Sequence, residues 1–440
     1  MRKIKPQTLK GFRDFLPEDM RVRNYVIDTF KKVFERYGYE PLETPALEYT
    51  YLMLGISGKE AEKQFFSFKD RGGRDVMLKF EVMVSMCRVV AQYKDKIVFP
   101  FKRYQIQRCW RAEKPQKGRY REFTQCDADT VGISSMIADA EFIQMGIEAM
   151  KELGFKNFVT LISNRKFLTG LAKFVELDPS LTYRICMSLD KFRKIGLNEV
   201  KKEMIKKIGL PPDKADKILR LISTKGENEK LIGNFKKKMA NIPEVQEGLT
   251  EIEEIFDYLK AAGVEKKYYR FDPSIARGLA HYTGPIWEVE VVEGSVGSIA
   301  GCGRYDNVIG SYLGGKEQIP ATGGSFGIER IIEILKSRKM INFPKSTAKV
   351  LVTFFDKKSS NESIKIANKL RKEGISTILY PNLEAKLNKQ LKYADKKSIP
   401  FVVIIGPDEI KKNVITLRDM KAQSQAQLSL KQLLERLAQI

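Results

Sequence analysis

The segment from Arg108 to Asp129 carries the densest set of side chains suited to chemistry. Pro115 and Gly118 mark a turn, and the residues on both sides alternate in character, which predicts a β-hairpin. On the first strand, Arg111 and Glu113 share one face. On the second strand, one face carries Arg121, Phe123, Gln125, Asp127 and Asp129, and the core-forming faces of the hairpin carry Trp110, Ala112, Cys126 and Ala128.

This combination of groups suits a nucleotide bound together with a second, zwitterionic substrate. Arginine binds phosphate oxygens through its forked guanidinium, and an aromatic ring stacks on a base. Carboxylates and an amide oxygen accept hydrogen bonds from an ammonium group. Charges this dense are unfavourable on a sheet face unless a ligand or partner charges complete them. The alternative, a solvated hairpin with surface ion pairs, does not explain why one face carries every special group.

The composition indicates a soluble globular protein with two or three domains. The chain has 440 residues, of which 43% are hydrophobic and 30% charged. No apolar run is long enough to span a membrane, and the basic N-terminus is not followed by a signal-peptide core. The net charge of +23 favours a polyanionic partner such as nucleic acid, although a lysine-rich surface kept for solubility has the same composition.

The cysteine and histidine content excludes several kinds of site. The five cysteines are scattered and lack CxxC spacing, so neither a zinc site nor a disulfide framework is predicted, and a reducing cytoplasm fits. His281 is the only histidine, which argues against a His-based metal cluster or a catalytic triad. We therefore expect no metal site formed by a cluster of protein side chains.

Helices and strands are mixed without βαβ alternation in the first large part, which predicts the α+β class. Apolar residues at helical spacing, among them Tyr25, predict a helix over 18–37, ended by Gly38, and another over 138–153. An extended segment with Pro41 and Pro45 follows the first helix. Strands are predicted at 98–113, 121–132, 285–292, 296–301 and 320–327.

Two further regions complete the predicted organisation. Residues 176–262 are lysine-rich and helical in pattern, so we interpret them as a helical insertion within a domain spanning 1–345, although they can also be read as more of its core. Residues 346–440 follow a βαβαβ pattern that predicts a small α/β domain with a parallel sheet. That domain has 18 Lys and Arg against 9 Asp and Glu, which suits contact with nucleic acid.

The hairpin resembles motif 2 of class II aminoacyl-tRNA synthetases, in the histidyl variety. The family's RAExPQxGRxREFxQxDxDxxG is matched from Arg111 through Gly132. Further segments resemble other parts of the family in order along the chain: Thr8 to Pro17 (KGxxDxLP), Gly38 to Leu47 (motif 1, the dimer interface), Phe68 to Arg74, Arg277 to Gly284 (RGLxYYTG), Gly301 to Asp306 (GGGRYD) and Gly323 to Arg330 (motif 3). The resemblance implies a catalytic domain built on an antiparallel sheet and a C-terminal anticodon-binding domain.

The resemblance also implies how ATP is bound. The implied ATP-binding residues are Arg111, Glu113, Arg119, Arg121, Phe123 and Arg330. Arg111 would contact the α-phosphate, Arg119 or Arg121 the outer phosphates, and Glu113 the adenine amine. The aromatic ring and the motif 3 arginine would enclose the adenine between them. Arg277 would be the catalytic arginine that contacts the α-phosphate and the substrate carboxylate, and Mg²⁺ would accompany the outer phosphates.

The same resemblance implies a histidine pocket, with departures from the family pattern. The implied pocket residues are Glu81, Met83, Gln125, Asp129, Arg277, His281, Tyr282 and Tyr305. Met83 stands where the family has a threonine that helps to bind the substrate ammonium, so one hydrogen bond is lost. Ala280 and His281 replace the commoner Asp-Tyr pair, and for His281 we favour a packing or pocket-wall role over a catalytic base.

The leading hypothesis is a histidine–tRNA ligase that activates histidine with ATP and transfers it to tRNA(His). We expect a cytoplasmic homodimer without a membrane segment, in which Lys114, Gln116 and Lys117 of the hairpin turn face the tRNA acceptor end. A paralogue that binds histidine or tRNA as a sensor or regulator is the alternative, motivated by Met83. The sequence from Arg277 to Gly284 speaks against a related synthetase for another amino acid.

Overall fold

The computed structural model describes residues 4–57, 65–115, 120–292, 297–315, 317–341, 343 and 345–438. The chain folds as two compact units, one formed by Met1–Phe15 and Val22–Met340 and the other by Leu16–Arg21 and Ile341–Ile440. Each unit has its own hydrophobic core. Within the described ranges, no helix combines the length and the apolar character needed to cross a membrane.

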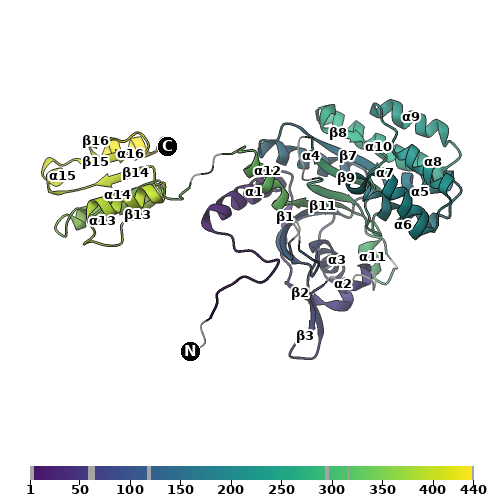
Figure 1. Ribbon diagram of the computed structural model, residues 1–440, viewed down its shortest axis with the longest axis horizontal. Coiled ribbons are helices and arrows are strands. Elements are labelled where there is room, and N and C mark those ends of the chain that lie inside the picture. The colour runs from purple at the N-terminus through teal and green to yellow at the C-terminus, as the bar shows by residue number, and fades with distance from the viewer. Residues whose placement is uncertain are drawn as a thin grey trace. The chain divides into compact units, whose positions relative to one another are not determined.

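The described part of the first unit is built on an eight-stranded sheet (Figure 1). The strands lie side by side in the order β1 (Glu40–Pro41), β5 (Phe101–Trp110), β6 (Glu122–Val131), β11 (Ala321–Gly327), β10 (Ala300–Arg304), β9 (Pro285–Val291), β7 (Phe158–Asn164) and β8 (Tyr269–Phe271). Neighbours from β5 to β7 are antiparallel, whereas β1–β5 and β7–β8 are parallel. This architecture confirms the predicted α+β class.

Two strands differ from their predicted bounds by more than one residue. β10 was expected over 296–301, but the strand begins at Ala300. Gly297 adopts a left-handed backbone conformation (φ 71°), and the Ser298 hydroxyl donates to the Ala300 carbonyl, so this stretch turns before it pairs. β5 ends at Trp110 rather than at Glu113.

Helices α1 (Pro17–Arg36) and α4 (Ile137–Glu152) cover one face of this sheet. Phe30 of α1 and Phe142 of α4 both pack on Phe326 of β11, with ring centres 4.8 and 6.0 Å apart. Gly38, in a left-handed conformation (φ 75°), follows the end of α1 as predicted. Tyr25 was assigned to the apolar stripe of this helix, but its side chain is 37% exposed, because the stripe that packs on the sheet is narrower than the sequence pattern suggested.

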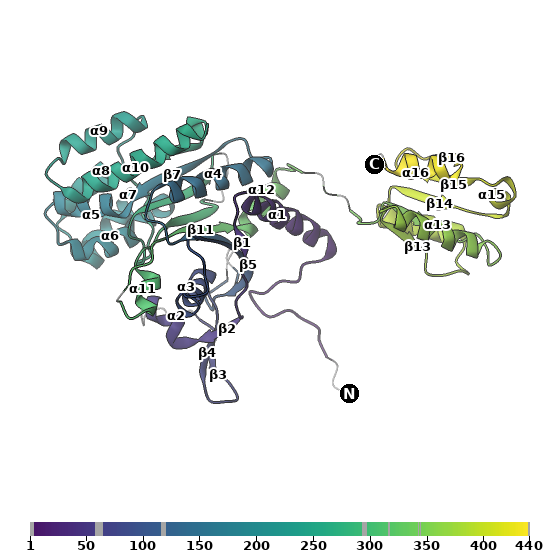
Figure 2. The ribbon, with the colours of Figure 1, turned by 180° about the vertical axis from the view of Figure 1, so that it is seen from behind.

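A smaller sheet and three helices form a second layer of the first unit (Figure 2). The sheet pairs β4 (Asp75–Leu78) with β2 (Leu47–Tyr49) and β3 (Ser67–Lys69), all antiparallel. Helices α2 (Thr50–Ser57), α3 (Val82–Gln92) and α11 (Val308–Tyr312) share one buried cluster with the small sheet. This layer places the segment before α3 against the central sheet, because the N–H of Trp110 donates to the carbonyl of Lys79 at 3.0 Å.

The region predicted as a helical insertion, residues 176–262, consists of helices joined by loops (Figure 1). It follows α5 (Arg165–Phe174) and comprises α6 (Thr182–Leu189), α7 (Phe192–Glu203), α8 (Pro212–Ile222), α9 (Asn228–Lys238) and α10 (Pro243–Ala261), with a short 3-10 turn at Pro179–Leu181 and a π-turn at Met204–Ile208. Another 3-10 turn, Lys266–Tyr268, precedes β8. Phe167 of α5 packs edge-on against Phe235 of α9 and Phe271 of β8, so these helices share a core with the edge of the sheet.

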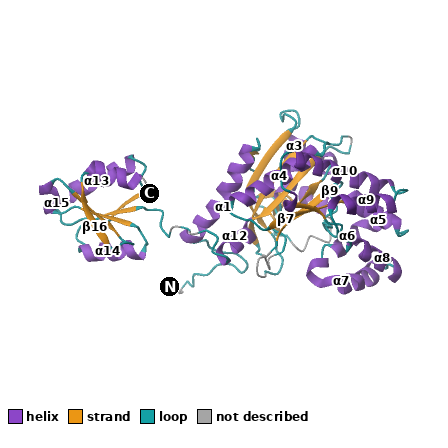
Figure 3. Cartoon of the chain, turned by 90° about the horizontal axis from the view of Figure 1, so that it is seen from above, coloured by secondary structure: helices purple, strands orange, loops and turns teal. Residues whose placement is uncertain are grey.

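The second unit is a sheet enclosed by helices (Figure 3). Its strands follow the order β13 (Thr377–Leu379), β12 (Val350–Val352), β14 (Phe401–Ile404), β15 (Ile415–Asp419) and β16 (Ser424–Leu428). Helices α13 (Ser360–Lys372) and α16 (Leu430–Ala438) pack in one core cluster and α14 (Leu387–Lys396) in another, while α15 (Pro407–Lys412) precedes β15.

The parallel sheet predicted for this unit is present, but it forms only part of a mixed sheet. The three strands of the βαβαβ pattern are parallel, but β15 and β16 add an antiparallel hairpin. The turn of this hairpin is closed by Asp419, whose Oδ1 accepts from the backbone N–H groups of Lys421 and Ala422. Such short strands, one of them mostly exposed, carry too few apolar residues to stand out in the sequence.

Candidate active site

One face of the central sheet gathers polar and glycine residues from neighbouring strands. Residues directly opposite each other on paired strands share a face. Asp129 of β6 lies opposite Arg103 of β5 and Gly323 of β11, and Gly323 lies opposite Gly303 of β10. The adjoining row runs through Gln105, Asp127, Ser325, Gly301 and Glu288. We call the surface formed by these two rows the polar face.

The opposite face of the same strands is apolar, and it fixes the polar face in place. Its fully buried residues include Cys126, Ala128, Trp287, Cys302 and Phe326. Burial of each large apolar side chain contributes about 1.5–3 kcal/mol, so these strands are firmly anchored on α1 and α4. Side chains on the polar face are therefore held by a rigid element, as a binding or catalytic constellation requires.

Arg111 and Phe123 lie together at the turn end of the β5–β6 hairpin. The N–H of Arg111 donates to the carbonyl of Arg121 at 2.8 Å, which continues the hairpin beyond the end of β5. The guanidinium carbon of Arg111 lies 4.8 Å from the centre of the Phe123 ring. A cation that is already positioned beside an aromatic ring suits a planar base carrying phosphates.

Other residues of the hairpin turn are placed differently from the prediction or fall outside it. Trp110 was assigned to the core, but it is only half-buried, because its indole N–H needs an acceptor and donates to Glu122 Oε2 at 2.9 Å. Ala112, also assigned to the core, is half-buried. Lys114 is exposed. Three predicted residues lie outside the described part of the chain: Gln116, Lys117 and Arg119.

Arg121 connects the turn to the N-terminal segment. Its Nε donates to the carbonyl of Glu113 at 3.1 Å, and its backbone N–H donates to the carbonyl of Gly11 at 2.9 Å. Gly11 is in a left-handed conformation (φ 90°), and a Cβ there would lie 2.8 Å from the Arg121 side chain. This arginine therefore holds the turn in place, and Glu113 is half-buried beside it.

The segment before α3 brings Glu81 against the hairpin. Glu81 immediately precedes α3, and the backbone N–H of Val82 donates to Gln125 Oε1 at 3.2 Å. The Nε of Arg111 donates to the carbonyl of Phe80 at 3.4 Å. Two predicted substrate-binding residues, Glu81 and Gln125, are thus joined through one backbone amide.

Three carboxyl groups at this site have raised pKa values, and in each the largest cause is burial. The pKa is raised to about 7 for Glu81, where Arg111 opposes the shift. It is raised to about 8 for Asp127 and to about 6 for Asp129, both opposed by Arg103. Because burial disfavours the charged form of each carboxyl, a cationic group entering the site would find acceptors that ionise readily on its arrival.

Asp129 is held by two partners at the centre of the polar face. The guanidinium of Arg103, fully buried, pairs with Asp129 Oδ2, and the hydroxyl of Tyr305 donates to Asp129 Oδ1. Arg103 Nη1 also donates to Gln105 Oε1 at 3.4 Å. These contacts keep the pKa of Asp129 below that of Asp127, whose Oδ1 has no hydrogen-bond partner among the described residues. Asp129 is therefore an oriented acceptor.

Replacing Asp127 with Asn is expected to stabilise the protein increasingly as the pH rises. Burial raises the pKa of Asp127 from 3.8 to about 8, so the folded state binds this proton more tightly than the unfolded state. The free energy of unfolding therefore falls as the pH rises from about 4 to about 8, and Asn removes this loss. The gain should reach roughly 2–4 kcal/mol at pH 7.

Thermal unfolding of the wild type and Asp127→Asn at pH 5 and pH 8 tests this expectation. The melting temperatures should lie close together at pH 5 and separate at pH 8, with the variant higher. Asp75→Asn is a suitable control, because Asp75 is a mostly exposed partner in a surface ion pair with Lys69. A difference for Asp127→Asn that does not grow between the two pH values would contradict the raised pKa.

Glycines in β10 allow Arg277 and Tyr282 to lie close against the sheet. A Cβ on Gly301 would collide with the Arg277 guanidinium, and one on Gly303 would lie 2.7 Å from the Tyr282 ring. Arg277 Nη1 donates to Glu288 Oε1 at 2.6 Å, and its Nε has no hydrogen-bond partner among the described residues. The site thus places a second guanidinium over the row that contains Asp127.

His281 lies half-buried between two tyrosines. Its ring centre is 4.4 Å from that of Tyr282 and 6.0 Å from that of Tyr305. Burial, together with the nearby cations Arg165 and Arg277, lowers the pKa of His281 to about 4. A neutral imidazole of such low basicity suits a pocket wall better than a general base, so the packing role remains the favoured prediction.

Met83 turns away from the polar groups. It lies in the first turn of α3 with 8% of its surface exposed, and its Sδ accepts a weak hydrogen bond from Cys87 Sγ at 3.5 Å. It belongs to the buried cluster that also contains Met77 and Phe80. Its side chain therefore fills the core beneath Glu81 and provides no donor to a substrate.

Arg330 lies at the same end of the sheet as Phe123. It is in the first turn of α12 (Ile328–Ser337), which directly follows β11, and its Nη1 donates to the carbonyl of Ser298. Gly327 at the end of β11 lies opposite Gln125, two residues along β6 from Phe123. The register therefore brings the motif 2 ring and the motif 3 arginine to neighbouring strand ends.

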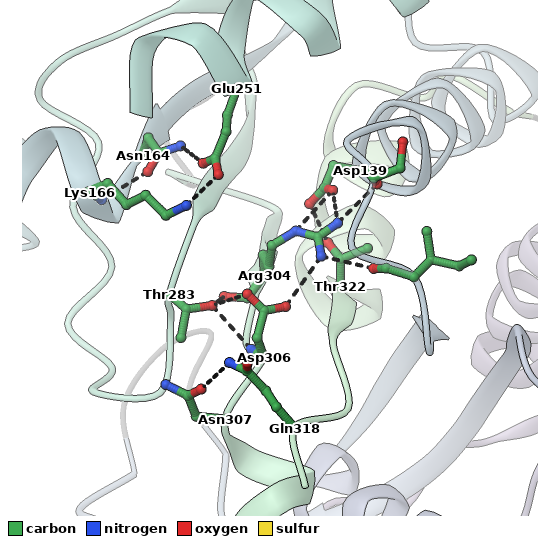
Figure 4. A network of polar contacts seen from close by, with 12 residues as sticks. Asp139, Asn164, Lys166, Glu251, Thr283, Arg304, Asp306, Asn307, Gln318 and Thr322 are labelled. Atoms are coloured by element: carbon green, nitrogen blue, oxygen red, sulfur yellow. Dashed lines mark hydrogen bonds and ion pairs between the residues drawn. The ribbon is translucent and has the colours of Figure 1, made fainter. Parts of the chain in front are cut away.

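A polar network fixes the segments that hold the two tyrosines, one just before β9 and the other just after β10 (Figure 4). Arg304, 2% exposed, pairs with Asp139 of α4 and with Asp306 at 3.2 Å. The hydroxyl of Thr283 donates to Asp306 Oδ2 at 2.8 Å, and that of Thr322 donates to Asp139 Oδ1 at 2.7 Å. Because Tyr282 precedes Thr283 and Tyr305 follows Arg304, the network orients both tyrosines that were predicted to line a pocket.

Taken together, the site offers cations for an anionic ligand and buried acceptors for a cationic one. Arg111 and Arg277 are the cations, and the half-buried Glu81 and the buried Asp129 are the acceptors. Four residues that build it were not singled out from the sequence: Arg103, Asp139, Glu288 and Arg304. The pairing of the hairpin strands was the available signal for Arg103, since counting back from the turn places it opposite Asp129.

Comparisons with known proteins give one consistent family. A family model described as histidyl-tRNA synthetase matches residues 11–331, and a model described as an anticodon binding domain matches residues 349–440. The chain is 37% identical over 418 residues to a histidine–tRNA ligase of Rhodopirellula baltica, covering 95% of this chain and 94% of that protein. It is also 37% identical over 434 residues to a histidine–tRNA ligase of Clostridium tetani, covering 98% and 97%.

A solved structure agrees with these relatives. The crystal structure of a histidyl-tRNA synthetase from Nostoc sp. PCC 7120 superimposes with a TM-score of 0.89 at 29% identity, covering 99% of this chain and 100% of that chain. The similarity therefore extends over both units.

Proposed function

This chain belongs to the histidyl-tRNA synthetase family, a class II aminoacyl-tRNA synthetase, and from that premise we propose that its polar face is where histidine is activated. The enzyme is a histidine–tRNA ligase that uses ATP. The observation that carries the assignment of the site is that Arg111, Arg277 and the buried carboxyl Asp129 converge on one face of a rigid sheet. This agrees with the resemblance of the motifs.

In the proposed ATP site, Arg111 binds the α-phosphate, and the adenine lies between Phe123 and Arg330. The stacked pair of Arg111 and Phe123 supports this, because it is formed before any nucleotide binds. Glu113 is assigned to the adenine amine and Arg121, together with Arg119, to the outer phosphates. Arg121 already donates to the backbone carbonyls of Glu113 in the turn and Lys10 in the N-terminal segment, so we expect phosphate binding to share or rearrange these contacts.

In the proposed histidine site, Asp129 accepts a hydrogen bond from the imidazole, while Tyr282 faces the ring and Tyr305 orients Asp129. An imidazole needs one donor and one acceptor partner, and a carboxylate with a tyrosine hydroxyl provides both. Glu81 and Gln125 bind the ammonium group. Met83 cannot donate the hydrogen bond that the family's threonine makes. We assign no other side chain of α3 to the substrate in its place.

The proposed chemistry is attack by a carboxylate oxygen of histidine on the α-phosphorus of ATP. The new O–P bond forms as the bond between the α-phosphorus and the bridging oxygen breaks, and pyrophosphate leaves. Arg277 neutralises charge on the α-phosphate, and Arg111 holds the phosphate in line. In the second step, a terminal hydroxyl of the tRNA attacks the histidyl carbonyl, and AMP leaves.

Mg²⁺ is proposed to arrive with the outer phosphates of ATP. Among the described residues, no group of three or more His, Cys, Asp or Glu side chains is arranged to hold a metal ion. Mg²⁺ commonly keeps several waters and uses one or two carboxylates together with substrate phosphates. In the proposed site, the phosphates of ATP and water would therefore provide most of the Mg²⁺ ligands.

The second unit and the hairpin turn are proposed to bind tRNA(His). The anticodon-binding match covers residues 349–440, and the net charge of +23 favours a polyanion. Lys114, with Gln116 and Lys117, is assigned to the acceptor end. Because charged tRNA serves translation, we propose that the enzyme acts in the cytoplasm.

A homodimer is proposed through the surface beside motif 1. Leu47, Tyr49 and Tyr51 are 43, 41 and 70% exposed and line a hollow of about 720 Å³. Exposed aromatic and aliphatic side chains gathered in one place mark an interaction surface. Sedimentation of a monomer at micromolar concentration would contradict this proposal.

The test of the proposed activity is histidine-dependent exchange of labelled pyrophosphate into ATP, followed by charging of tRNA(His). We expect exchange with histidine and not with the other amino acids. The alternative, a sensor or regulator motivated by Met83, predicts histidine or tRNA binding without exchange. Titration of histidine with and without ATP, run on the same preparation, separates these two outcomes.

A further inference from the structure

We propose that Asp190 and Arg193 of the helical insertion are positioning residues that hold the loop carrying Arg277. This inference rests on the proposed role of Arg277 and deepens it. We call residues 272–284, between β8 and β9, the arginine loop. Its position would then depend on the insertion, and not only on the catalytic sheet from which it emerges.

The first observation is that two acidic side chains of β9 each pair with an arginine from another segment. Glu288 and Glu290 are two residues apart, so their side chains leave the strand on the same face. Glu288 accepts from Arg277 of the arginine loop at 2.6 Å, whereas Glu290 pairs with Arg193 at the start of α7. The insertion and the proposed catalytic arginine are thus anchored side by side on one strand.

The second observation is that Arg193 also holds the beginning of the arginine loop. Its Nη2 donates to Asp272 Oδ2 at 2.9 Å. Asp272 Oδ1 accepts from the backbone N–H and the hydroxyl of Ser274, at 3.0 and 2.6 Å. One guanidinium therefore links β9 to the residue at which the loop leaves β8.

The third observation is that the middle of the loop lies between α6 and α5. The N–H of Gly278 donates to Asp190, which follows the end of α6, and a Cβ on Gly278 would lie 3.6 Å from Asp190 Cβ and from Met187 Cα. From α5, Arg165 Nη2 donates to the carbonyls of Arg277 and Leu279, both at 2.7 Å. The backbone of Arg277 is consequently fixed on both sides.

These contacts imply a positioning role more than a contribution to stability. Arg193 and Glu290 are 35 and 39% exposed, and ion pairs at such exposure contribute little to the stability of the fold. A small displacement of a guanidinium aimed at a reacting phosphate is costly in rate, because catalysis depends on alignment. Loss of Arg193 should therefore lower turnover without unfolding the protein.

The test is the steady-state kinetics of pyrophosphate exchange with Arg193→Met in the full-length enzyme. We expect kcat to fall roughly 10- to 100-fold, the range for a displaced catalytic group, with the KM for ATP and for histidine within about threefold of the wild type. Arg193→Lys should recover part of this loss. Lys201→Met is the matched control, because Lys201 pairs with Asp216 inside the insertion and should have wild-type kinetics.

A second variant, Glu290→Gln, and hydrogen exchange of the arginine loop test the same positioning role independently. Glu290→Gln removes the partner instead of the arginine, and it should lower kcat in the same direction. Arg193→Met should also increase deuterium uptake in peptides spanning residues 272–284. If the wild type does not catalyse exchange, the proposed function itself fails. If the wild type is active and folded Arg193→Met, Arg193→Lys and Glu290→Gln all keep the wild-type kcat, the inference is overturned. It is also overturned if Arg193→Met unfolds and the other two variants keep the wild-type kcat.

Discussion

Replacing Arg277 with Met is expected to lower kcat for histidine-dependent pyrophosphate exchange by about 100- to 1,000-fold. A preorganised donor aimed at charge that develops in the transition state is worth a factor of this size. Arg277 meets that description, because Glu288 holds Nη1 at 2.6 Å and Gly301 leaves room for the guanidinium against the sheet. Pre-steady-state measurement of adenylate formation gives the effect on the chemical step directly.

The pattern of the loss matters as much as its size. ATP binding should change little, since Arg111 and Phe123 form their stacked pair without Arg277. Arg277→Lys keeps the charge but lacks the fork, so most of the loss should remain. Arg270→Met is the control: Arg270 is 52% exposed on β8, and its contact with Asp272 is 3.9 Å long. Exchange by Arg277→Met within tenfold of the wild type would remove Arg277 from the proposed mechanism.

The part of the fold that the sequence predicted well is the part with strong periodicity. Helix α1 and helix α4 lie within one residue of their expected ends, because long apolar stripes and a following glycine define them. The two strands of the motif 2 hairpin alternate clearly and were also expected. The β15–β16 hairpin was missed, since its stability comes from pairing with β14 rather than from its own sequence.

The candidate site was predictable where charged residues cluster in the sequence and not where they meet only in the fold. Asp129 stands out because it lies on the second strand of the motif 2 hairpin, but its partner Arg103 lies on the neighbouring strand and becomes visible only through the register. Glu288 is one of two acids in β9, and only the return of the arginine loop shows what it holds. Residues that position other residues carry no local signature.

Replacing Asp129 with Asn is expected to reduce kcat/KM for histidine by roughly 10- to 150-fold, while the KM for ATP stays near that of the wild type. A hydrogen bond to a charged acceptor is worth about 1.5–3 kcal/mol, and the amide keeps the shape of the carboxylate without its charge. Most of the loss should fall on the KM for histidine, because the contact is made in the ground state as well. Initial rates with each substrate varied in turn measure both constants.

Tyr305→Phe separates the charge of Asp129 from its orientation. This variant removes the hydroxyl that donates to Asp129 Oδ1 but leaves the ion pair with Arg103, so its effect on kcat/KM should be smaller than that of Asp129→Asn. Asp129→Asn also leaves Arg103 buried beside a neutral amide, which should lower the melting temperature, so activity must be measured well below that temperature. Asp216→Asn, in an exposed pair with Lys201, controls for loss of a negative charge. If Asp129→Asn binds histidine as tightly as the wild type, the imidazole does not rest on Asp129, and its acceptor must be sought in the two other carboxyl groups of the site, Glu81 and Asp127.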